Sequence, residues 1–62
     1  MITEERLQGA IKLANEITGA TFQLWYDEWI YKLIQDWEVI ADWSRIEPLY
    51  NVLVESVKQY MY

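Results

Sequence analysis

Apolar and polar positions alternate along the first third of the chain with the period of a helix. Between Leu7 and Ile17, apolar side chains recur at i, i+3 and i+4, and charged or polar side chains occupy the other side. Thr3 is suited to cap the start of this stretch, where Glu4 and Glu5 meet the positive end of the helix dipole. Gly19 is suited to end it in a left-handed conformation. The pattern predicts a first helix at about 4–18.

The middle stretch, FQLWYDEWIYKLIQDWEVIADW, spans 22–43 and contains all four tryptophans. Placed on a helical wheel, most of its large apolar residues fall in one arc of roughly 140°. Consecutive apolar triplets, such as the one from Leu24 to Tyr26, fit strand alternation poorly. We therefore expect a long central helix at 22–43, with Trp29, Leu33 and Trp37 in the core.

A third apolar arc follows Pro48 and predicts a helix at about 48–60. Its start has two alternatives. Ser44 and Glu47 have the spacing of a capping box, which places the first helical residue at Arg45. Pro48 instead favours a helix that starts at Pro48 itself. Proline has no backbone N–H, and the N–H of the first helical residue has no acceptor within the helix.

Together these stretches predict one all-α domain over residues 1–62, a compact three-helix unit. The short connection at 19–21 makes the first two helices an antiparallel hairpin, onto which the third helix packs. A chain of this length buries only about 60% of the surface that it exposes when unfolded. Because it has no cysteine and no histidine, disulfides and a histidine-bound metal cannot stabilise it. We therefore expect aromatic packing and self-association, with a twofold dimer favoured.

The outer side of the predicted central helix supplies the candidate interface. It combines apolar residues that have no place in a monomer's core with a stripe of acids. Its members are Leu24, Trp25, Asp27, Tyr31, Glu38, Val39 and Asp42. Large amphipathic aromatic side chains are typical anchors of protein interfaces, and the acids favour a basic partner surface. Whether the aromatic residues serve self-association or a separate partner stays open.

The net charge of −5 is concentrated in one part of the chain, because six of the ten acids lie between Asp27 and Glu47. This balance disfavours direct binding to DNA or RNA, whose phosphates require Lys and Arg. A membrane role is also disfavoured, since no apolar run is long enough to cross a bilayer and surface-binding helices are typically basic. The N-terminus does not resemble a signal peptide, and the lack of cysteine favours a cytoplasmic protein.

Candidate chemistry is sparse. Without an imidazole or a thiol, a serine, threonine, lysine or tyrosine nucleophile has no ordinary activating partner. The carboxylates of the predicted central helix point outward, whereas carboxylate-bridged metal bundles place theirs inside. We expect no catalytic site, no metal site and no cofactor, and therefore not an enzyme.

The sequence favours a small acidic protein–protein binding module, an inhibitor or an adaptor. The alternative is a structural homo-oligomer or assembly component with no separate target. In size and charge the chain resembles small acidic helical proteins of phages, including anti-CRISPR inhibitors and DNA mimics. That resemblance implies possible mimicry of nucleic acid, since acids three or four positions apart on a helix are about 5 to 6 Å apart.

Overall fold

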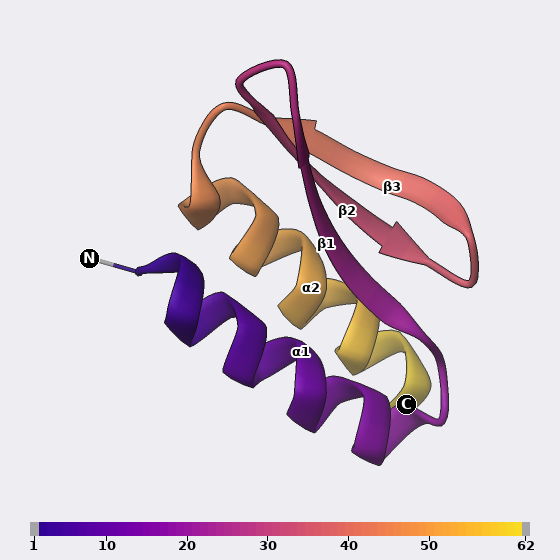
Figure 1. Cartoon of the computed structure of the whole chain (residues 1–62). Helices are drawn as coiled ribbons and strands as arrows, with labels where there is room; N and C mark the ends of the chain where they lie inside the picture. The colour runs from indigo at the N-terminus through magenta and orange to yellow at the C-terminus, as the bar shows by residue number, and fades with distance from the viewer. Residues whose placement is uncertain (1, 62) are drawn as a thin grey trace.

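The computed structural model describes residues 2–61 and contains a sheet as well as helices (Figure 1). Along the chain the elements are α1 (Glu4–Thr18), β1 (Phe22–Asp27), β2 (Ile30–Gln35), β3 (Glu38–Trp43) and α2 (Ile46–Met61). The protein is thus α+β. The all-α prediction and the predicted three-helix unit are wrong.

Helix α1 has the ends that the sequence predicts. The Thr3 hydroxyl oxygen accepts a hydrogen bond from the backbone N–H of Arg6 at 3.2 Å, which satisfies one free donor of the first turn. Gly19 takes a left-handed conformation with φ of 75°, and its N–H donates to the Asn15 carbonyl at 3.0 Å. Only glycine adopts this conformation without a steric penalty, so the chain leaves the helix there.

The predicted central helix at 22–43 is instead a meander of three antiparallel strands in the order β1-β2-β3. The segment is rich in aromatic and β-branched residues, which favour a pleated, half-buried surface. Each strand has six residues, and two-residue turns at 28–29 and 36–37 join them. Strand pairing, which a helical wheel does not represent, therefore determines the structure of this segment.

Both helices lie on the same face of the sheet and run in the same direction (Figure 1). Each of the three antiparallel strands reverses the chain, so α2 starts at the end of the molecule where α1 also starts. The predicted antiparallel hairpin of helices at 4–18 and 22–43 is wrong, because its second segment forms the three strands. Helix α2 begins at Ile46, between the two predicted starts, with Pro48 in the first turn, where its missing N–H is not needed.

The core lies between the helices and the inner face of the sheet. Its buried residues are Leu7, Ile11, Ala14, Phe22, Leu33, Leu49 and Leu53. Leu33 is fully buried, as the sequence predicts, whereas Trp29 and Trp37 are 82% and 77% exposed, so their assignment to the core is wrong. Strand register explains this difference, because Leu33 lies in the middle of β2 and both tryptophans lie in turns.

An irregularity in β3 directs two consecutive side chains toward the core. The pairing runs from Leu33 with Ala41 to Ile34 with Val39, so Ile40 has no partner on β2. An extra residue of this kind is a β-bulge, which bends its strand. Ile40 and Ala41 both pack against the buried cluster. Val39 and Asp42, on either side of the bulge, are exposed.

Within residues 2–61, neither helix combines the length and the apolar character that crossing a membrane requires.

Candidate functional site

No helix within the described residues 2–61 covers the outer face of the sheet, because α1 and α2 both pack on the other face (Figure 1). Alternation along the strands and the strand register identify the residues of this open face. They are Gln23, Trp25 and Asp27 of β1, Ile30, Lys32 and Ile34 of β2, and Val39 and Asp42 of β3. We call this set the open face.

An indole ring covers part of the open face. Trp25 Nε1 donates a hydrogen bond to Gln23 Oε1 at 3.1 Å, which directs the indole along β1 toward the row formed by Gln23, Ile34 and Val39. Ile34 is only 4% exposed, although it does not belong to the cluster beneath the helices. Its neighbours on the open face therefore cover it. The result is a small apolar patch with Trp25 and Val39 exposed above Ile34.

The row of residues beside this patch carries charge. Trp25, Lys32 and Asp42 lie side by side on the three strands, so the only lysine of the sheet is between an aromatic ring and a carboxylate. In the part of the chain that the structure describes, the one ion pair within 4 Å joins Lys58 and Glu55 of α2. Lys32 therefore does not neutralise Asp42 by direct contact, and the carboxylate remains available at the surface.

Both hairpin turns place a tryptophan in an unfavourable backbone conformation. Glu28 and Trp29 have φ of 48° and 67°, and Asp36 and Trp37 have φ of 49° and 71°. Two-residue turns with positive φ at both positions are type I′, which favour Asn-Gly or Asp-Gly. Each non-glycine residue in a left-handed conformation is destabilised by about 1–2 kcal/mol. Nevertheless, both turns have tryptophan where glycine is preferred, and both tryptophans are exposed.

One turn is fixed by its acid. The Asp36 carboxylate accepts a hydrogen bond from the Thr21 N–H at 3.0 Å, and the Asp36 N–H donates to the Thr21 carbonyl at 2.9 Å. These two contacts connect the second turn to the residue before β1. Trp37 therefore projects from a constrained backbone, and its exposure does not reflect a loose loop.

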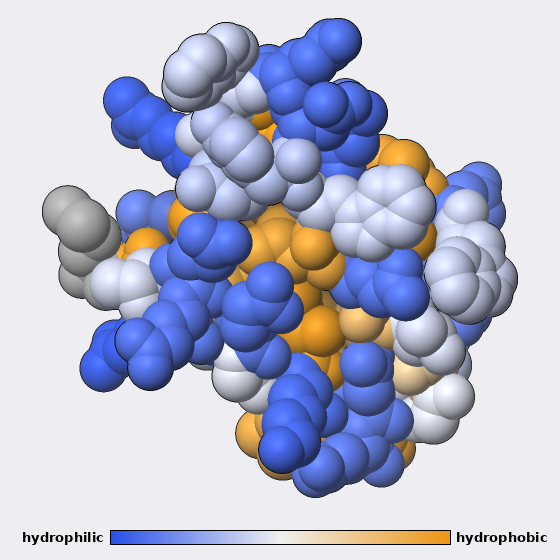
Figure 2. Space-filling view, in the orientation of Figure 1, coloured by the Kyte–Doolittle hydropathy of each residue, from blue (hydrophilic) through white to orange (hydrophobic). Residues whose placement is uncertain are grey.

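The sheet carries most of the net charge of the chain. Residues 22–43 contain five acids and one lysine, a net charge of −4 out of −5 in total. Figure 2 shows that residues of high hydropathy gather between α1 and the sheet, whereas pale or blue side chains of lower hydropathy cover the sheet's turns at the top and right. The surface on the sheet side therefore combines negative charge with aromatic rings.

The structure separates the residues that the sequence assigned to one interface. Trp25, Asp27, Val39 and Asp42 lie together on the open face. Leu24 and Tyr31 lie on the opposite face, half-buried against the core. Their placement on an exposed surface is wrong, because strand alternation sends Leu24 and Trp25 to opposite sides.

Glu38 is exposed at the start of β3, where it pairs with Gln35 on the helix side of the sheet. It therefore lies outside the open face. Trp29 and Trp37, which sequence reasoning placed in the core, flank the open face at the two turns. Trp29 and Trp37 are eight residues apart, which is the length of one six-residue strand plus one two-residue turn. This spacing is the sequence signal that would have placed both tryptophans in turns.

Among residues 2–61 no group of three or more acidic side chains is placed to hold a metal ion. The acids also do not follow the helical spacing on which nucleic-acid mimicry was predicted, because they lie on strands and turns. Comparison with protein-family models, curated proteins and solved structures gave no match.

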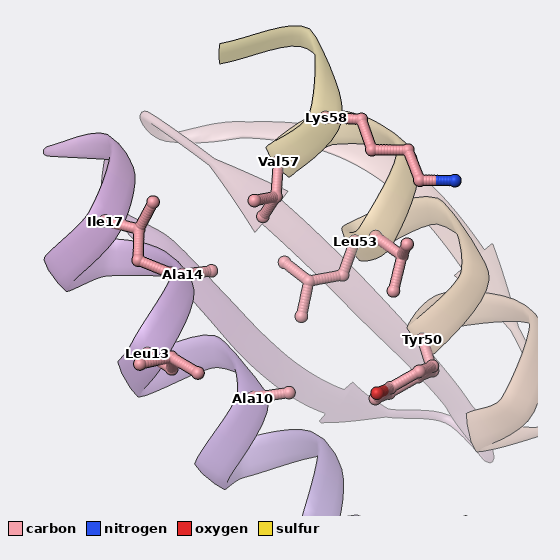
Figure 3. A pocket seen from close by; sticks show the side chains of 9 residues that line it. Ala10, Leu13, Ala14, Ile17, Tyr50, Leu53, Val57 and Lys58 are labelled. Carbon is pink, nitrogen blue, oxygen red and sulfur yellow. The ribbon is translucent and has the colours of Figure 1, made fainter. Parts of the chain in front are cut away.

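A second exposed apolar surface lies on the far side of the molecule, between the two helices (Figure 3). It is a groove of about 270 Å³. Its lining comprises Ala10, Leu13, Ala14 and Ile17 of α1 and Tyr50, Leu53, Val54, Val57 and Lys58 of α2. We call it the helix groove. Because the sheet lies behind it, the helix groove and the open face are on opposite sides of the molecule.

Proposed function

We propose that this protein is a small protein-binding module, an inhibitor or an adaptor, and that it contacts its partner with the open face and the two adjoining turns. The observation that carries the proposal is the pair of strained, exposed tryptophans, Trp29 and Trp37. Strained conformations that persist in a fold occur most often at functional sites. Here the strain supports no packing in the core, so a role in binding accounts for it best.

Tryptophan suits this role physically. It is enriched among the interface residues that contribute most to binding, because it buries a large area and loses little side-chain entropy. The open face and its two turns present Trp25, Trp29 and Trp37, and each is more than half exposed. Trp43, which pairs with Tyr31, lies on the helix side of the sheet. An isolated exposed apolar residue is ordinary, whereas three exposed tryptophans on one face and its turns are typical of a contact surface.

The charge of the sheet selects the partner. On the open face and its turns, four acids against one lysine favour a basic protein surface, and complementary fields raise the association rate and fix the orientation of the complex. The same charge disfavours nucleic acid as a direct partner, because binding there depends on neutralising phosphates. Since the chain has no cysteine, a cytoplasmic setting fits the proposal.

The experiment that tests this function is a comparative affinity capture from the native host with two charge-reversed variants. Asp27→Lys with Asp42→Lys changes the net charge by four units on the open face. Glu5→Lys with Glu16→Lys makes the same change on exposed positions of α1 and serves as the matched control. A specific partner should be retained by the wild type and the control and lost by the open-face variant.

The captured partner then allows a salt titration with purified components. Binding by the wild type should weaken as salt is raised, because the screening length falls from about 10 Å at 0.1 M to about 3 Å at 1 M. If both double variants bind the partner with the wild-type affinity, the acids of the open face are only solvated and take no part in binding. Loss of the partner from both variants would indicate a bulk charge effect instead of a surface.

A structural homo-oligomer with no separate target is the second candidate function, and the apolar helix groove favours it. This alternative gives no reason for strained tryptophans on the opposite side of the molecule, so we rank it second.

A further inference from the structure

The helix groove exposes apolar side chains that a monomer would leave in water. Leu13 and Ile17 of α1 are 57% and 54% exposed, although both are large aliphatic residues. In Figure 3, Tyr50 points from α2 toward Ala10 of α1, whereas Lys58 extends away from the space between the helices. Lys58 is the only charged residue of the lining. An apolar groove with a polar rim is typical of a surface that another chain covers.

The distribution of charge identifies the occupant. The helix groove has no acid in its lining, so it offers nothing to the basic partner that suits the sheet. Two copies of the chain, each with a net charge of −5, repel one another unless the contact avoids their acids. Contact between two open faces would oppose Asp27 and Asp42 of one copy, with the turn acids Glu28 and Asp36, to the same acids of the other. Contact between two helix layers places both acidic sheets on the outside of the assembly.

The shape of the groove suits a contact with itself. Leu13 and Ile17 form a projecting ridge on α1, and the small side chains of Ala10 and Ala14 leave a hollow beside it. In a twofold contact each copy supplies both features, so the ridge of one copy enters the hollow of the other.

We infer that the protein forms a twofold dimer through the helix groove, in which Leu13 and Ile17 of each copy pack into the groove of the other. The two open faces then point away from each other and remain accessible. This inference does not depend on the proposed function, because it rests on the opposite side of the molecule.

Light scattering coupled to size exclusion, with sedimentation equilibrium, tests the dimer. The wild type should have twice the 7.5 kDa mass of the chain at micromolar concentration. Leu13→Arg and Ile17→Arg, made separately, should each raise the dissociation constant about tenfold or more, because each places a charge in the buried centre of the contact. Both positions are more than half exposed in one copy, so each variant should keep the wild-type helical circular dichroism.

Trp25→Arg is the matched control, because Trp25 has a similar exposed fraction of 54% but lies on the open face. It should dimerise as the wild type does. A wild type that stays monomeric to high micromolar concentration, or that forms assemblies larger than two copies, would overturn the inference. So would folded Leu13→Arg and Ile17→Arg proteins with the wild-type dissociation constant, or a dimer disrupted by Trp25→Arg alone.

Discussion

The side-chain amide of Asn15 pairs with the backbone of Phe22 as a neighbouring strand would. Asn15 Oδ1 accepts from the Phe22 N–H at 2.6 Å, and Asn15 Nδ2 donates to the Phe22 carbonyl at 3.2 Å. Both groups are partly buried, so water does not replace these contacts fully. The pair joins the last turn of α1 to the start of β1 and thereby positions the first strand over the helix.

Replacing this amide should destabilise the fold. Asn15→Ala leaves a donor and an acceptor of the backbone without partners, and we expect the free energy of unfolding to fall by about 2 kcal/mol. Urea denaturation followed by circular dichroism measures the change. Asn51→Ala, at an exposed asparagine of α2, is the control and should change stability much less. Equal effects of the two substitutions would show that the Asn15 contacts contribute nothing special.

The core should depend on Leu33 far more than on any tryptophan. Leu33→Ala opens a cavity beneath both helices, at a cost of about 2–5 kcal/mol. That range is comparable to the about 3–5 kcal/mol that a core of this size supplies, so the variant should be largely unfolded. Far-UV circular dichroism at room temperature reports the outcome. Val39→Ala, on the open face, should stay folded, and a folded Leu33→Ala protein with near-native stability would contradict the described core.

Tryptophan fluorescence should change little when the protein unfolds. Every tryptophan is more than half exposed in the folded monomer, so its indole already contacts water. We therefore expect the emission maximum in buffer to lie close to that of the urea-unfolded chain, and iodide to quench the folded protein efficiently. A strong blue shift in buffer that disappears in urea would mean that at least one indole is buried. Repeating the measurement with Leu13→Arg excludes any contribution from the dimer.

The two helices are predictable from sequence because their signals are local. The stripe from Leu7 to Ile17 lies on one face of a helix, and Thr3 and Gly19 mark its ends through contacts within a few residues. The second helix is less well placed at its start. Pro48 is the third residue of α2 and not the first. The backbone N–H groups of the first turn have no acceptor within the helix, so a proline is tolerated at any of these positions.

The strands could not be predicted in the same way, because the turns between them contain no glycine, proline or asparagine. A type I′ hairpin is usually recognised by Asn-Gly or Asp-Gly, whereas this chain has Glu28-Trp29 and Asp36-Trp37. Without those breaks, six-residue strands join into one apolar run that a helical wheel also accommodates. The aromatic and β-branched composition was the evidence for strands, together with the eight-residue spacing of the two turns.

The candidate surface was predictable only in part, for a related reason. Exposed acids such as Asp27 and Asp42 are recognised in any secondary structure, because charged residues avoid the core. The side taken by an apolar residue depends instead on the period, which is about 3.6 in a helix and 2 in a strand. Hence Leu24 and Tyr31, predicted on the surface, lie on the core side of the sheet, and Trp29 and Trp37, predicted in the core, lie at the surface.

The role of the turn tryptophans can be separated from their effect on the fold. Trp29→Gly with Trp37→Gly removes both rings and relieves the left-handed strain at these two positions, while Glu28 and Asp36 keep theirs. The relief of about 1–2 kcal/mol per site exceeds the about 0.5–1 kcal/mol by which glycine's extra chain entropy opposes folding. The double glycine variant should therefore be more stable than the wild type by about 1 kcal/mol per site. Trp29→Ala with Trp37→Ala removes the same rings and keeps the strain, so it should not gain this stability.

The most direct test of a binding role for the sheet measures thermal unfolding and affinity capture together on the double glycine variant, the double alanine variant and the wild type. If the tryptophans are held under strain for recognition, the glycine variant melts at a higher temperature than the wild type, and both variants fail to retain the partner that the wild type captures. A glycine variant that melts lower than the wild type would contradict the strain at these positions, and one that retains the partner at the wild-type level would contradict a binding role for Trp29 and Trp37.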